Sequence, residues 1–149
     1  MKKTVAIADL PSLAGTELGA TDWVTITQDQ INAFADATGD HQWIHVDVER
    51  ATKEMGGTIA HGFLTLSLLP MLSAQLLAVS GVSRGVNYGL NKLRFTGMVP
   101  SGAKVRLREK VLDVTEKSGG YQFTRECTVE IEGKDRPALV AEWVTILFP

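Results

Sequence analysis

Two side chains that commonly cooperate in proton transfer lie five positions apart in this 149-residue sequence: Asp40 and His45. Asp40 directly follows Gly39, and His45 closes the run GDHQWIH. A carboxylate can act as a base or orient an imidazole, and an imidazole titrates near neutral pH. The pair therefore predicts general acid–base chemistry, although Asp and His beside a helix end also serve as caps, turns or solvated surface.

The residues around this pair predict a loop between two helices. Thr27 followed by Gln30 has the pattern of a capping box, apolar residues then recur at helical spacing, and Gly39 is suited to end the helix. A second short helix is expected over residues 47–55, because two glycines follow it. A short strand is expected at residues 22–26, before the first helix.

The following segment, residues 61–81, is apolar on nearly every side and ends in a glycine, which predicts a helix surrounded by protein. Four strand-like runs come next, separated by Gly- and Pro-containing turns. The runs are residues 86–95, 104–114, 121–132 and 138–148. The even positions of residues 121–132 are polar, as in a sheet with one solvated face, which places Cys127 on the buried face.

These elements predict an α+β fold in which a long central apolar helix is wrapped by an antiparallel meander. A length of 149 residues suits one domain, residues 1–149. The net charge of -2 provides no basic field for nucleic acid. The single cysteine fits a reducing compartment, and Asp9 and Pro11 interrupt the N-terminal apolar stretch too early for a signal peptide. Polar residues within residues 62–79 argue against a membrane span, so the expected location is cytoplasmic.

The GDHQWIH loop, the apolar helix beginning HG, the run NYGLNKLRF and the final strands together resemble the MaoC-like (R)-specific enoyl-CoA hydratases and dehydratases, a family with the hotdog fold. The resemblance covers nearly the whole chain. NYGLNKLRF is also similar to the branch that contains the nodulation protein N-like hydratases. The family signature is a Gly-Asp, a short variable stretch, an aliphatic residue with a His, and a small residue six positions later. Here it is matched by Gly39, Asp40, Ile44, His45 and Ala51.

The resemblance implies a hydro-lyase of the enoyl-CoA hydratase 2 type, with Asp40 and His45 as its catalytic pair. The reaction would hydrate a trans-2-enoyl-CoA to the (3R)-3-hydroxyacyl-CoA, or reverse this. The family spacing selects His45 rather than the neighbouring His41. Gln42 and Trp43 depart from the usual Asn-Pro, which removes a rigid residue and leaves Gln42 as the candidate polar replacement. The resemblance also implies a homodimer. Coenzyme A is part of the substrate, and we expect neither a separate cofactor nor a metal.

Charge that builds on the thioester oxygen requires hydrogen-bond donors. The start of the apolar helix offers the backbone N–H groups of Gly62 and Phe63, although a glycine there could instead permit close helix–sheet contact. Ser67 matches a family position near the acid–base pair, yet a serine inside a helix often bonds its own backbone. His61 is assigned a supporting role.

Two other functions remain open on the same fold. A thioesterase usually needs a carboxylate or comparable group on the central helix, and residues 61–81 contain no Asp or Glu. A non-catalytic acyl-thioester binding module would keep the fold without the activity. The length of the acyl chain and the physiological direction do not follow from the sequence.

Overall fold

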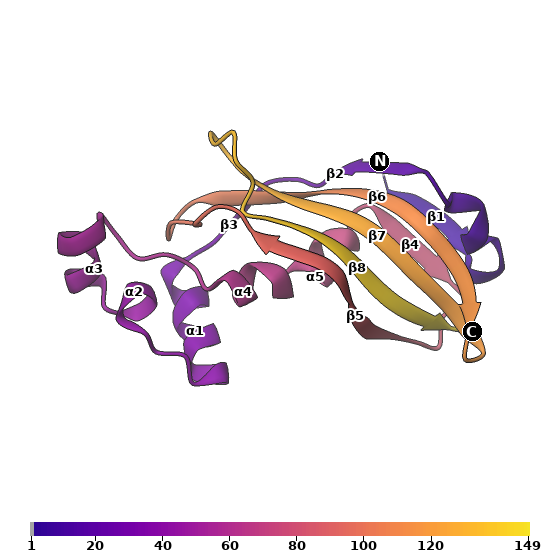
Figure 1. Ribbon diagram of the computed structural model, residues 1–149, viewed down its shortest axis with the longest axis horizontal. Helices are drawn as coiled ribbons and strands as arrows, with labels where there is room; N and C mark the ends of the chain where they lie inside the picture. Colours follow the sequence, from indigo (N-terminus) through magenta and orange to yellow (C-terminus); the bar gives the residue numbers. More distant parts are fainter. Residues whose placement is uncertain (1) are drawn as a thin grey trace.

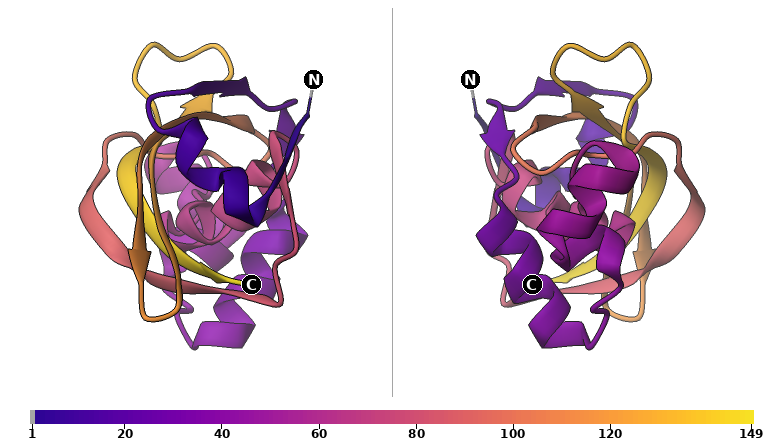
Figure 2. Two further views of the ribbon diagram at one scale, coloured as in Figure 1. Left: turned by 90° about the vertical axis from the view of Figure 1, so that its right-hand side faces the viewer. Right: turned by 90° about the vertical axis from the view of Figure 1, so that its left-hand side faces the viewer.

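A curved antiparallel sheet wraps a short helical run, and three further helices lie together at one end (Figure 1, Figure 2). The computed structural model describes residues 2–149. Its elements are β1 (Lys3–Ala6), the 3-10 helix η1 (Ile7–Leu13), β2 (Glu17–Ala20), β3 (Val24–Thr25), α1 (Gln28–Thr38), α2 (Trp43–Val46), α3 (Val48–Met55), α4 (Gly62–Ser67), α5 (Leu69–Ser73), β4 (Leu77–Ser80), β5 (Arg84–Phe95), β6 (Lys104–Lys117), β7 (Gly120–Ile131) and β8 (Leu139–Phe148).

The predicted meander is wrong in one connection. The main sheet has the order β2-β6-β7-β8-β5, with β3 also paired to β6, so β5 pairs with β8 and does not neighbour β6. The segment between β5 and β6 explains this, because it is bonded to the loop before α4 instead of forming a hairpin. Ala60 N–H donates to Val99 O at 2.8 Å, and Ser101 N–H donates to Thr58 O at 3.0 Å.

The predicted central helix over residues 61–81 is shorter than expected and is interrupted. It consists of α4 and α5, which are separated at Leu68. Pro70 lies in the first turn of α5 and has no N–H to donate, so the helical bond to the preceding turn is missing there. Beyond Ser73 the chain becomes β4, which pairs in parallel with β1, a strand that the sequence analysis missed together with η1 and β2.

The two helices beside the acid–base loop are confirmed. Thr27 caps α1 by accepting a hydrogen bond from the Gln30 N–H at 3.1 Å, and Gly39 ends the helix in the left-handed conformation with φ 83°. The helix expected over residues 47–55 is α3, which Asp47 caps. The strand expected at residues 22–26 is reduced to the two residues of β3.

The main core lies between α4–α5 and the concave face of the sheet. Leu69 and Leu72 of α5 are buried against inward-facing residues such as Leu107, Val129 and Leu139. Cys127 is fully buried among them, as its strand register predicts. Within residues 2–149 no helix combines the length and the hydrophobicity that a membrane span requires.

Candidate active site

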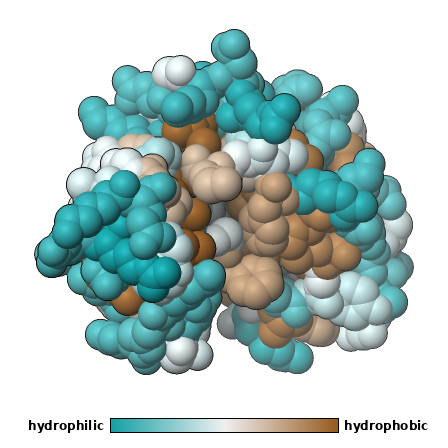
Figure 3. Space-filling view, turned by 60° about the vertical axis from the view of Figure 1, so that its left-hand side comes forward, coloured by the Kyte–Doolittle hydropathy of each residue, from teal (hydrophilic) through white to brown (hydrophobic). Residues whose placement is uncertain are grey.

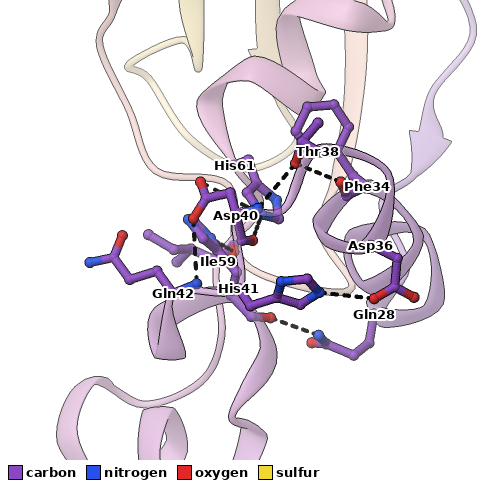
Figure 4. A network of polar contacts seen from close by, with 10 residues as sticks. Gln28, Phe34, Asp36, Thr38, Asp40, His41, Gln42, Ile59 and His61 are labelled. Atoms are coloured by element: carbon purple, nitrogen blue, oxygen red, sulfur yellow. Dashed lines mark hydrogen bonds and ion pairs between the residues drawn. The ribbon is translucent and has the colours of Figure 1, made fainter.

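The loop between α1 and α3 brings Asp40 and His45 together. Asp40 follows the Gly39 cap of α1, and His45 lies on α2, a single turn of helix that the sequence analysis did not predict. The backbone N–H of Gln42 donates to Asp40 Oδ1 at 3.4 Å. The Asp40 carboxylate lies on the side of the loop that faces His61 (Figure 4).

His45 is held in one orientation by groups on two segments, α1 and the loop before α4. Its side chain is buried, and its Nδ1–H donates to the Ile59 carbonyl at 2.7 Å. Gln28 of α1 donates to the His45 backbone carbonyl at 2.8 Å and accepts a hydrogen bond from the Thr58 hydroxyl. Because Nδ1 carries the proton, the neutral ring presents the lone pair of Nε2, the form required of a general base.

His61 lies directly against this pair. Its ring stacks on the His45 ring with centroids 3.8 Å apart, and Phe34 covers it at 4.9 Å. The His61 Nε2–H donates to the Asp40 backbone carbonyl at 3.0 Å, and Nε2 lies 4.0 Å from the Asp40 carboxylate (Figure 4). His61 thus fixes the position of both predicted catalytic residues.

One nitrogen or oxygen atom from each of Asp40, His45 and His61 lies within 4.8 Å of the others. This separation leaves room for a water molecule that hydrogen-bonds to both the carboxylate and the imidazole. The same spacing would suit a divalent cation, and the expectation that none is needed stays a prediction.

His41, the neighbouring imidazole, faces another group. Its Nε2 lies 3.0 Å from Asp36 Oδ1 on α1 (Figure 4). The hydrogen bond to the Asp36 carboxylate raises the pKa of His41 above its ordinary value. The ring is exposed and bonded away from Asp40, so of the two neighbouring candidates, His41 and His45, only His45 is available to pair with Asp40.

A cleft of about 440 Å³ opens beside His45 between α4 and the segment after β5. Gly62 lies on its wall, where a Cβ would approach the Phe95 ring to 3.0 Å. Thr65 also lines the cleft, and its buried hydroxyl has no hydrogen-bond partner within the described chain. The space-filling view shows hydrophobic surface gathered around a hollow on one face (Figure 3).

The remaining predicted positions, Phe63, Ser67 and Gln42, do not line this cleft. Phe63 is exposed and packs edge-on against Phe95. Ser67 donates to the Phe63 carbonyl at 2.7 Å and lines a separate hollow of about 290 Å³. The Gln42 side chain is exposed and extends away from the Asp40 carboxylate (Figure 4).

Three further residues at the site were not predicted from the sequence: Gln28, Thr58 and Thr65. Thr65 follows His61 by four positions, which places both on one side of α4, and this spacing is the signal that could have identified it. Gln28 and Thr58 left no such signal, because their contacts join segments 30 residues apart.

The known proteins that are similar to this chain in sequence indicate one family, and those that are similar in structure have the same fold as this chain. The family model described as MaoC like domain matches residues 9–132. The chain is 53% identical over 144 residues to 3-hydroxyacyl-thioester dehydratase Z of Mycobacterium tuberculosis, covering 95% of each protein. It is 48% identical over 148 residues to Nodulation protein N of Rhizobium leguminosarum bv. viciae, covering 96% of this chain and 91% of that relative.

Two solved structures share the fold at low sequence identity. R-Hydratase PhaJ1 from Pseudomonas aeruginosa has a TM-score of 0.72 and 23% identity, with coverage of 91% of this chain and 81% of that chain. The (R)-hydratase from A. caviae involved in PHA biosynthesis also has a TM-score of 0.72 and 23% identity, with coverage of 91% and 96%. The expected α+β hotdog fold is therefore confirmed.

Proposed function

This chain belongs to the MaoC-like dehydratase family, and on that premise we propose that it is an (R)-specific hydro-lyase of acyl-CoA thioesters. It would convert a trans-2-enoyl-CoA and water into the (3R)-3-hydroxyacyl-CoA, or catalyse the reverse dehydration. The observation that carries this proposal is the juxtaposition of Asp40 with the free Nε2 of His45 beside a cleft at the start of α4.

The proposed reaction needs one proton removed and one delivered. Asp40 and His45 hold the water between them, and one of them takes its proton while the oxygen bonds to C3 of the enoyl group. The electrons of the C2–C3 double bond move toward the thioester oxygen. The acid–base pair then supplies a proton to C2, so that the sum is the addition of one water molecule.

The negative charge that develops on the thioester oxygen would be stabilised by hydrogen-bond donors at the start of α4. The N–H groups of Gly62 and Phe63 belong to its first turn, where backbone donors have no partner within the helix. The Thr65 hydroxyl adds a donor on the same wall. Gly62 allows a substrate to approach its backbone closely because it carries no side chain.

An assay with purified protein and crotonyl-CoA tests this function. We expect the absorbance of the conjugated double bond to fall without release of free thiol. Release of free thiol would instead identify a thioesterase. Absence of both reactions with crotonyl- and hexenoyl-CoA would contradict the enzymatic proposal and favour a binding module.

We also propose that the protein is a homodimer that pairs through β5. This strand ends the sheet at one side and its residues are almost all exposed, including Tyr88 at 55% and Val86 at 42%. A long exposed edge of this kind is a ready template for another strand.

Light scattering tests the β5 interface. We expect a mass about twice the 16.2 kDa of one chain, and we expect Tyr88→Glu to give the monomer because it places a charge within the edge. Val48→Glu, at an equally exposed apolar residue on α3, is the matched control and should stay dimeric. A wild-type monomer at micromolar concentration would contradict the proposal.

A further inference from the structure

A second cavity lies further along the helical run from the active-site cleft. It has a volume of about 390 Å³ and lies between α5, β4, the start of β5 and the inner face of β7 and β8. It shares Pro70, Asn87 and Trp143 with the hollow beside Ser67. The residues that line the three hollows therefore follow α4 and α5 in order, from Gly62 to the end of α5.

Most of this second cavity is apolar, but a buried arginine forms part of its wall. Arg125 on β7 is 5% exposed, and its guanidinium lies 3.7 Å from the centre of the Trp143 ring and 4.3 Å from that of Phe123. Nη2 donates to the Thr145 hydroxyl at 2.8 Å and Nη1 donates to the Ser73 hydroxyl at 3.3 Å. The Nε–H has no hydrogen-bond partner among residues 2–149.

The nearby Glu109 does not supply that missing partner. Its carboxylate is buried and accepts a hydrogen bond from Ser73 at 2.9 Å, and it lies 4.0 Å from Arg125 Nη1. Burial raises the pKa of Glu109 and opposes its ionisation. A guanidinium stays protonated even when buried, so its unpaired donor favours an acceptor brought by a ligand.

We propose that this distal cavity receives the far end of an acyl chain that bears an oxygen acceptor, a carboxylate or a hydroxyl, which accepts a hydrogen bond from Arg125 Nε. The inference rests on the proposed function, because the chain would run from the thioester at Gly62 along α4 and α5. The apolar wall surrounds the methylene groups, while Arg125 selects the oxygenated end. The substrate class is thus the ω-oxidised enoyl-CoA thioesters.

The length of the helical run sets the scale of the chain. The twelve residues of Gly62–Ser73 span roughly 16 Å at helical rise. An extended alkyl chain advances about 1.3 Å for each carbon–carbon bond, given a bond length near 1.5 Å. A chain of about 12 carbons would therefore reach the cavity, whereas a four-carbon crotonyl group would not.

The test compares three trans-2-enoyl-CoA substrates of 12 carbons that end in a methyl, a hydroxyl or a carboxyl group, with crotonyl-CoA as the short reference. We expect kcat/KM of wild-type protein to be about ten-fold higher for an oxygenated end than for the methyl end, the size of effect that one charge-assisted hydrogen bond produces. Equal or higher kcat/KM for the methyl end would overturn the proposal.

Two variants separate recognition from folding. Arg125→Met combined with Glu109→Gln removes the buried guanidinium together with the carboxyl group beside it. Ala74→Trp narrows the cavity while Arg125 itself is retained. Each should abolish the preference for the oxygenated end. Arg106→Met with Glu130→Gln removes an ion pair from β6 and β7 outside the cavity, and this matched control should keep the preference.

A binding measurement keeps this inference distinct from the proposed activity. Saturated dodecanoyl-CoA that bears a terminal carboxyl group, which cannot be hydrated, should bind wild-type protein about ten-fold more tightly than unsubstituted dodecanoyl-CoA by calorimetry, and the difference should vanish in the two cavity variants. If no thioester is converted but this difference in affinity is observed, the proposed hydro-lyase activity is contradicted and the assignment of the distal cavity is kept. If crotonyl-CoA is hydrated but neither probe set shows the preference, the pocket assignment fails alone.

Discussion

Asp40→Asn and His45→Gln are each expected to lower kcat for crotonyl-CoA by about 10² to 10⁴-fold, the range that general acid–base groups contribute. Both substitutions keep the size of the side chain and remove its capacity to exchange the proton. The backbone N–H of Gln42 can still donate to an amide oxygen at position 40. Steady-state kinetics on the purified variants, with circular dichroism to check folding, measures the effect.

The two substitutions should be strongly non-additive, because the two groups act on one water molecule in one step. The double variant should therefore lose little more activity than the worse single variant. His41→Gln is the matched control, since this imidazole is adjacent in sequence but bonded to Asp36. Near-wild-type turnover by both single variants, or a loss in His41→Gln as large as in His45→Gln, would show that the site is wrongly assigned.

The local parts of the site could be predicted because the signals that define them lie within a few residues. Thr27 and Gln30 form the cap of α1, and Gly39 ends it, so the position of Asp40 follows from the sequence alone. Family spacing then added His45. The contact of His61 with both residues did not follow, because it requires the start of α4 to pack against the end of α1, and His61 is 21 positions from Asp40 in the sequence.

The positions of the strands could be predicted from the sequence, but which strands pair with each other could not. The four long strands have clear patterns, but the neighbour of β5 is decided by the hydrogen bonds that tie residues 99–101 to the loop before α4. The end of the central helix was missed for a related reason. Residues 77–80 continue the apolar pattern of the predicted helix. They form a strand only because β1, which is distant in the sequence, pairs with them.

Arg125 illustrates a third kind of limit. Its position in the buried register of β7 was visible in the sequence, whereas its partners come from α5 and β8. A charged residue in an apolar register indicates that the charge is buried and paired, but the sequence does not identify its partner. The aromatic rings, the hydroxyl groups and the cavity around this guanidinium become apparent only in the folded chain.

Gly62→Val is expected to lower kcat by about 10²-fold while leaving the pH dependence of kcat unchanged, as loss of one oxyanion donor typically does. The substitution adds no titrating group and removes none. A branched side chain at this wall of the cleft would keep the thioester oxygen away from the N–H groups at the start of α4. Initial rates with crotonyl-CoA across pH 5 to 9, at saturating substrate, measure both quantities.

The competing explanation is displacement of Phe95, whose ring would lie 3.0 Å from a Cβ at position 62. Phe95→Leu removes that contact and serves as the matched background. If crowding of the backbone donors causes the loss, Gly62→Val should remain impaired in the Phe95→Leu protein. Recovery of turnover in the double variant would instead mean that Gly62 serves only to accommodate the ring, and the oxyanion assignment would then be abandoned while Asp40 and His45 keep their proposed roles.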